Sequence, residues 1–125
     1  MPKLYKIDNI MYRVSDLEKS TYFYQNALGM KKAWEDKDAK MVGFIFENSD
    51  SEIVIHNNKE LPKFDYSYLV DDVEKFCRKY KSSGYKLVSK PVKVRSGKYA
   101  ILQDLDDNKI PIIDLTKFSG KPRYN

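Results

Sequence analysis

The sequence predicts an α+β protein built from two βαβββ modules. A segment with alternating side chains, residues 7–14, runs directly into a segment with helical spacing that ends at Gly29. The same succession returns in the second half, where Val70–Val73 repeats Val14–Leu17 and Gly84 repeats Gly29, 56 and 55 residues further on. Repeated units of this size cannot bury their apolar faces alone, so we expect the two modules to stack on each other.

The first module begins with a strand and a helix. Ser15, followed by Glu18 three residues later, is the capping-box pattern that begins a helix. We expect the helix to end at Gly29, because glycine readily adopts the left-handed conformation of a helix C-terminus. Its inward positions, at helical spacing, are Leu17, Thr21, Tyr24 and Leu28.

The remaining strands follow from alternation and turn signals. In the first module we expect strands at residues 31–35, 40–46 and 52–56, with polar turns at residues 36–39 and 48–51. The second module is predicted to contain a strand at 66–70, a helix at 72–83 and extended segments at 86–94, 99–103 and 110–115. Pro91 either interrupts the 86–94 segment or places it at a sheet edge, because proline cannot donate to a ladder.

The length of 125 residues, with 42% hydrophobic residues, suits one domain with a modest core. The predicted boundaries within the single domain 1–125 are module 1 at about 5–57, a connector at 58–64, module 2 at about 65–116 and an irregular tail at 117–125.

Charge and cysteine content limit the partners. The 23 basic residues are scattered among 18 acidic ones in a chain of net charge +5, so we expect no nucleic-acid partner, which needs clustered charge. No apolar run of 18 residues is present, so no membrane association is expected. The single cysteine, Cys77, excludes an internal disulfide and indicates a cytoplasmic protein.

Residues 11–17, 23–30, 70–73 and 104–108 resemble the vicinal oxygen chelate superfamily, which includes glyoxalase I, bleomycin-resistance proteins and extradiol dioxygenases. The resemblance runs from about Ile7 to Thr116 and is closest to glyoxalase I in the first half. It implies a mixed sheet that curls around a concave cavity. In metal-dependent members this cavity holds one divalent ion.

The resemblance also implies where the metal ligands of glyoxalase I, two histidines and two glutamates, fall in this chain. The matching positions are Asn9, Val54, Asp65 and Pro111. Valine and proline have no side-chain donor, and asparagine and aspartate offer only oxygens. We therefore expect no metal and no cofactor.

Other candidate site residues remain after the metal is set aside. Arg13 matches an arginine that binds the carboxylate of the glutathione substrate in glyoxalase I, although an intramolecular salt bridge is an equally good account. Asn58 matches a glutathione-contacting asparagine, for which a turn role is the stronger account. His56, the one histidine, would be a metal ligand if the register were displaced by two residues; the favoured account is a polar residue at the cavity rim or a strand end, and a lone general base is a further alternative. Trp34, Met11, Phe44 and Tyr99 are candidates to line the cavity, although most aromatic residues in such a chain belong to the core.

The leading expectation is a protein that binds a small organic molecule, anionic or aromatic, without the family metal. The alternative is a divergent lyase or isomerase of glyoxalase type that uses Asn9, His56 and Asp65 in an altered site. A third reading is an accessory domain with no small-molecule role. A homodimer is expected because each βαβββ sheet is open at one edge.

Overall fold

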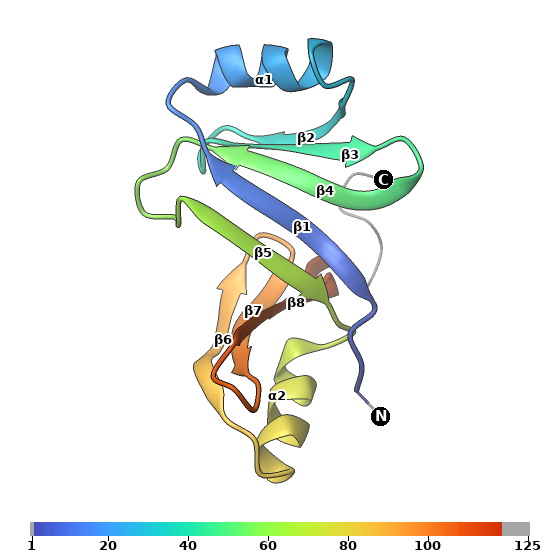
Figure 1. Ribbon diagram of the computed structural model, residues 1–125, viewed down its shortest axis with the longest axis vertical. Coiled ribbons are helices and arrows are strands. Elements are labelled where there is room, and N and C mark those ends of the chain that lie inside the picture. The colour runs from blue at the N-terminus through green and yellow to red at the C-terminus, as the bar shows by residue number, and fades with distance from the viewer. Residues whose placement is uncertain (1, 119–125) are drawn as a thin grey trace. The chain divides into compact units, whose positions relative to one another are not determined.

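The structure, a computed structural model, describes residues 2–118. These residues form eight strands and two α-helices in the order strand, helix and three strands, twice over (Figure 1). The order confirms the α+β class and the βαβββ succession. The chain divides into a first compact unit, Asp8–Tyr66, and a second, residues 2–7 with 67–118.

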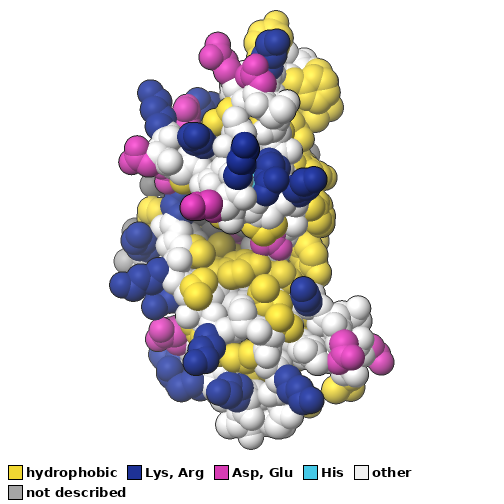
Figure 2. Space-filling model, turned by 90° about the vertical axis from the view of Figure 1, so that its left-hand side faces the viewer, with side chains coloured by type: hydrophobic (Ala, Val, Ile, Leu, Met, Phe, Trp, Pro, Cys, Tyr) yellow, Lys and Arg dark blue, Asp and Glu magenta, His cyan; other side chains and the backbone are white. Residues whose placement is uncertain are grey.

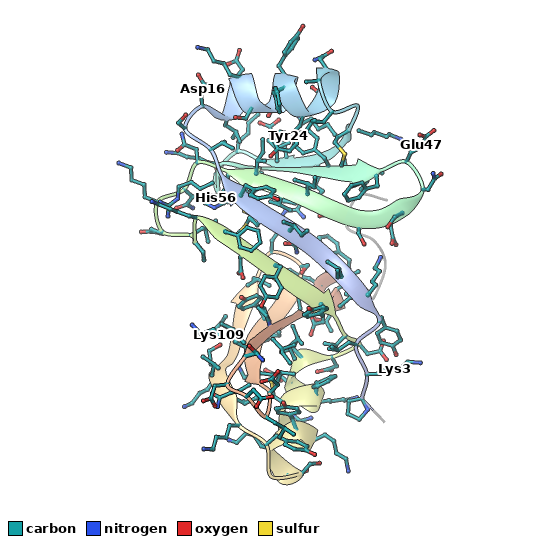
Figure 3. All side chains as sticks on the ribbon, viewed as in Figure 1. Lys3, Asp16, Tyr24, Glu47, His56 and Lys109 are labelled. Carbon is teal, nitrogen blue, oxygen red and sulfur yellow. The ribbon has the colours of Figure 1, made fainter. Side chains whose placement is uncertain are left out.

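In the first unit the strands lie in the order β2-β3-β4-β1, with β1 parallel to β4 and the other neighbours antiparallel. Helix α1 covers one face of these strands (Figure 1). There the ring of Tyr24 stacks on Phe44 with 5.4 Å between centroids, and Figure 3 shows Tyr24 on the sheet side of the helix. The elements are β1 Lys6–Arg13, α1 Leu17–Asn26, β2 Lys31–Asp36, β3 Met41–Phe46 and β4 Ser49–His56.

The second unit repeats this topology, with the strand order β6-β7-β8-β5 and β5 parallel to β8. Strand β6 is the outer strand on its side, and its pairing with β7 shifts between Ser89 and Val92, around Pro91. The predicted edge position of Pro91 is confirmed. The elements are β5 Phe64–Leu69, α2 Val73–Ser82, β6 Leu87–Val94, β7 Gly97–Gln103, β8 Lys109–Ile113 and a 3-10 turn at Thr116–Phe118.

Both helices begin in the same way. The carboxylate of Asp16 accepts the Lys19 N–H at 3.0 Å, and that of Asp72 accepts the Lys75 N–H at 3.0 Å (Figure 3 labels Asp16). The predicted capping box led by Ser15 is therefore wrong, because the N-cap is one residue later, where a carboxylate also stabilises the positive end of the helix. The two caps lie at equivalent positions of the repeat.

Two other sequence predictions fail at the ends of elements. Strand β4 begins at Ser49, so the predicted turn at residues 48–51 is wrong, and Glu47 and Asn48 form a tight hairpin turn instead (Figure 3 labels Glu47). Polar side chains do not prevent pairing here, because the ladder uses only backbone groups. Helix α1 ends at Asn26, which leaves Leu28 53% exposed rather than inward-facing.

A buried carboxylate fixes α2 on its strands. Asp114 is 1% exposed and accepts the N–H groups of Val73, at 2.8 Å, and Lys98, at 2.9 Å. A Cβ atom at Gly97 would lie 2.0 Å from Asp114 Oδ1, so this close approach requires glycine. The helix then buries Val73 and Cys77 in the core, and burial raises the pKa of the Cys77 thiol, which keeps it protonated.

The surface carries charges of both signs. On the face shown in Figure 2, lysine and arginine side chains are interspersed with acidic and apolar ones. Neither helix of the described part of the chain is long and apolar enough to cross a membrane. Beyond residue 118, the predicted irregular tail lies outside the described residues.

Candidate functional site

The parallel pairing of β1 with β4 brings most of the predicted site residues together. Paired residues project to the same face of a sheet, and neighbours along a strand project to opposite faces. Val42 and Phe44 on β3 and Ile55 on β4 pack toward α1. The residues of β1 and β4 that alternate with Ile55 and its register partner therefore point to the opposite face of the sheet. We call this set the β1/β4 face; its members are Asn9, Met11 and Arg13 on β1, paired with Glu52, Val54 and His56 on β4.

His56 is fully buried at the end of β4, where the connector to β5 begins (Figure 3). Its Nδ1 atom accepts the backbone N–H of Asn58 at 3.1 Å. With Nδ1 as an acceptor, Nε2 carries the proton and donates to the Pro62 carbonyl, 2.8 Å away. Both ring nitrogens of the neutral imidazole therefore hold the connector, and in this conformation neither is available to a substrate.

Arg13, the register partner of His56, contacts the same connector. Its Nη2 donates to the carbonyl oxygens of Lys59, at 3.3 Å, and Leu61. The Arg13 backbone N–H donates to the Lys63 carbonyl at 2.9 Å. Within residues 2–118 Arg13 forms no ion pair, so the salt bridge that the sequence allowed as an alternative is not formed there. The guanidinium is thus oriented by carbonyl oxygens and has no carboxylate partner within these residues.

Asn58 is held by its own loop. Its side-chain amide donates to the Ala39 carbonyl at 3.3 Å, and its side-chain oxygen accepts the Glu60 N–H at 3.0 Å. These bonds are those of a turn residue, the account that the sequence favoured. Together Arg13, His56 and Asn58 form what we call the connector clamp.

Trp34 lies across the β1/β4 face at Gly43. Its indole N–H donates to Glu52 Oε1 at 3.1 Å, and Glu52 is only 1% exposed. A Cβ atom at Gly43 would lie 2.1 Å from Trp34 Nε1, so the indole occupies the space that a side chain would need. Neither Glu52 nor Gly43 was predicted from the sequence as a site residue. One feature of the sequence could have identified Glu52: strand alternation places this charged residue on the same face as Val54 and His56.

The other predicted site residues have local partners. Asn9 donates from its side-chain amide to Asp8 Oδ2 at 2.8 Å, and Asp8 is 3% exposed. Met11, which lies between Asn9 and Arg13 along β1, is 9% exposed. On β5, Asp65 accepts the backbone N–H of Tyr66 at 2.9 Å.

The positions that the resemblance assigns to metal ligands do not fit a nickel, zinc or iron ion. Val54, 3% exposed, presents only methyl groups, and Pro111 on β8 has no side-chain donor. His56, two residues beyond Val54, has both ring nitrogens bonded to the connector. Among residues 2–118, no group of three or more His, Cys, Asp and Glu side chains is arranged to hold a metal ion.

Comparison with known proteins identifies the family. The sequence profile of the Glyoxalase/Bleomycin resistance protein/Dioxygenase superfamily matches residues 6–112, and the chain belongs to this superfamily. It is 31% identical over 124 residues to lactoylglutathione lyase from Haemophilus influenzae, covering 87% of this chain and 92% of that one. It is 32% identical over 119 residues to lactoylglutathione lyase from Neisseria meningitidis serogroup A, covering 82% and 86%.

Solved structures share the fold at lower identity. Methylmalonyl-CoA epimerase from Mycobacterium tuberculosis superimposes with a TM-score of 0.66 at 16% identity, covering 94% of this chain and 93% of that one. A superfamily member from Vibrio splendidus gives a TM-score of 0.57 at 15% identity, covering 91% and 99%. At these identities the likeness shows a common fold and nothing about the ligand.

The contact between Trp34 and Gly43 can be tested with the fluorescence of the one tryptophan. In Gly43→Ala the new methyl group must displace the indole and break its hydrogen bond to Glu52. We expect emission to shift to longer wavelength as the indole gains water, with a loss of about 1–3 kcal/mol in the free energy of unfolding.

Gly29→Ala is the matched control, because Gly29 has a positive φ of 66° but no atom within 4 Å of an added Cβ. This substitution should lower stability through backbone strain, by about 1 kcal/mol, without moving the emission maximum. An unchanged spectrum in Gly43→Ala would show that the indole does not occupy this position.

Proposed function

We propose that this protein binds a small organic anion at the β1/β4 face, with Arg13 as the anchor, and that binding does not use the family metal. The observation that carries the proposal is the state of Arg13: an oriented guanidinium with no carboxylate partner within residues 2–118. A planar guanidinium suits bidentate recognition of a carboxylate or phosphate.

The contacts of Arg13 leave donors for such a ligand. Within residues 2–118 its side-chain hydrogen bonds use Nη2 alone, and its buried Nε–H group has no hydrogen-bond partner there. Buried donors are nearly always paired in folded proteins, so a ligand oxygen would satisfy a group that the chain itself leaves unsatisfied. The two apolar members of the face, Met11 and Val54, would supply apolar contact for the rest of the ligand.

A second candidate is a divergent lyase of glyoxalase type, favoured by relatives of about 30% identity that are named lactoylglutathione lyase. Such an enzyme would draw on Asn9, Asp65 and His56. For His56 to act as a general base, it would first have to release the Asn58 N–H from Nδ1. An assay for lactoylglutathione formation by the purified protein, with and without added metal, distinguishes this candidate from a binding protein.

Replacing Arg13 tests the anchor. In Arg13→Met the stem remains and the charge is lost, so affinity for an anionic ligand should fall by about 1.5–3 kcal/mol, the usual value for a hydrogen bond to a charged group. Calorimetric titration with glutathione S-conjugates and aromatic carboxylates measures the change.

Lys31→Met is the control, since it removes the same charge from an exposed position on β2. Arg13→Lys adds a second comparison, because it keeps the charge and loses the planar fork. Unaltered affinity in Arg13→Met, with a large loss of stability, would assign Arg13 to the connector clamp alone.

Metal titration tests the proposal that the protein functions without the family metal. A ligand raises the melting temperature only when it binds the folded state with useful affinity. Nickel, zinc or cobalt should leave the melting temperature unchanged in differential scanning calorimetry, because Val54 and Pro111 cannot ligate. A saturable increase with one of these ions would refute the proposal and favour the lyase.

We further propose that the protein acts as a homodimer in the cytoplasm. Outer strands such as β2 and β6 retain backbone groups that a second copy can pair with or cover. The single thiol of Cys77 is buried and suits a reducing compartment. Light scattering at micromolar concentration should give about twice the 14.7 kDa of one chain, and a monomer mass would contradict the dimer.

A further inference from the structure

The second unit contains a hollow that the proposed function does not use. Its volume is about 370 Å³, within the range of small-molecule sites. It lies where the N-terminal segment meets the start of α2. The lining residues are Pro2, Lys3, Tyr5, Asp71, Asp72, Lys75, Phe76 and Lys79.

Three lysines line this hollow, Lys3, Lys75 and Lys79. None of them forms an ion pair within residues 2–118. Lys75 and Lys79 are four residues apart on α2 and therefore project from the same side of the helix.

The two carboxylates in the lining are engaged in internal bonds. Asp71 accepts the Tyr5 hydroxyl at 2.6 Å, and Asp72 caps α2 by accepting the Lys75 N–H at 3.0 Å. The hydrogen bond to Asp71 raises the pKa of Tyr5, which keeps the phenol protonated as the donor. These bonds leave both carboxylates charged, so with three lysines and two aspartates in the lining the hollow has a net charge of +1.

Aromatic surface lies beside these cations. Phe76 packs on the buried core of the second unit with one part of its ring, and also lines the hollow. The ring of Tyr5 lies beneath the Lys3 ammonium group, 5.1 Å from its centroid. A flat apolar group can contact these rings while an attached anion meets the lysines.

A hollow in the first unit lacks this complementarity. It measures about 450 Å³ and is lined by residues of α1 and of strands β2 and β3. Its one cation, Lys32, is paired with Glu35 at 2.6 Å. Volume alone therefore does not distinguish the two hollows, whereas net charge does: the lining is +1 in the second unit and −1 in the first, where Glu18 and Glu35 outnumber Lys32.

We propose that the hollow between Tyr5 and Phe76 is a second binding site, for a small organic anion with an aromatic body, such as an aromatic carboxylate or sulfonate. The site uses different residues from the β1/β4 face. It can therefore be confirmed or refuted independently of the function proposed for Arg13. A small molecule is favoured over a macromolecule because the hollow holds one ring system with its acidic group.

The test uses 8-anilinonaphthalene-1-sulfonate, an aromatic sulfonate whose fluorescence rises on binding, with the full chain. In Lys75→Gln/Lys79→Gln its dissociation constant should rise about two- to thirtyfold, the combined effect of two exposed charges. Added sodium chloride should weaken binding to the unsubstituted protein, because it screens exposed charges.

Lys81→Gln/Lys86→Gln is the matched control, since it removes two exposed lysines that do not line the hollow. This variant should bind the dye as the unsubstituted protein does, and an equal loss in both variants would overturn the site in favour of general cationic attraction. Amide chemical shifts should change at residues 3–5 and 71–79. Changes confined to residues 9–13 and 52–56, with loss of dye binding in Arg13→Met, would place the dye on the β1/β4 face and refute the second site.

Discussion

The path of the chain in the first unit depends on which donors form hydrogen bonds with the carbonyl groups of the connector. A segment without regular structure must find partners for each buried backbone group. Here Arg13 and His56, register partners across the parallel β1 and β4 strands, donate to three successive parts of the connector at Lys59, Leu61 and Pro62. One strand pairing therefore determines both the end of the sheet and the path of the chain that leaves it.

This constraint changes the meaning of the residues that resemble functional ones. A histidine on a ligand-bearing strand suggests a metal or a base, yet both nitrogens of His56 are committed to backbone groups. Arg13 differs, because carbonyl oxygens orient a guanidinium without neutralising it. An arginine can thus bind the loop and still offer its positive charge to a ligand. An imidazole with hydrogen bonds at both nitrogens cannot bind the loop and also accept a proton from a substrate.

The sequence predicted the features that depend on local pattern and repetition. The repeat led to two βαβββ units, and it appears in the structure as equivalent N-caps at Asp16 and Asp72. The contact of Trp34 with Gly43 and Glu52 could not be predicted from local pattern or repetition. Alternation assigns a face, but the reach of an indole over the next strands depends on the register shift between Lys32 and Trp34, which no local pattern specifies.

The second unit shows that the fold itself does not require the clamp. At the position equivalent to Arg13 and His56, the last pair of the parallel β5 and β8 strands is Leu69 with Ile113. Two apolar residues complete that pairing, and the unit's buried polar centre is instead Asp114, which binds the start of α2. Parallel pairing of the outer residues therefore needs no charge. The arginine and histidine of the first unit therefore serve the connector that lies beside them, and the architecture that the two units share does not require them.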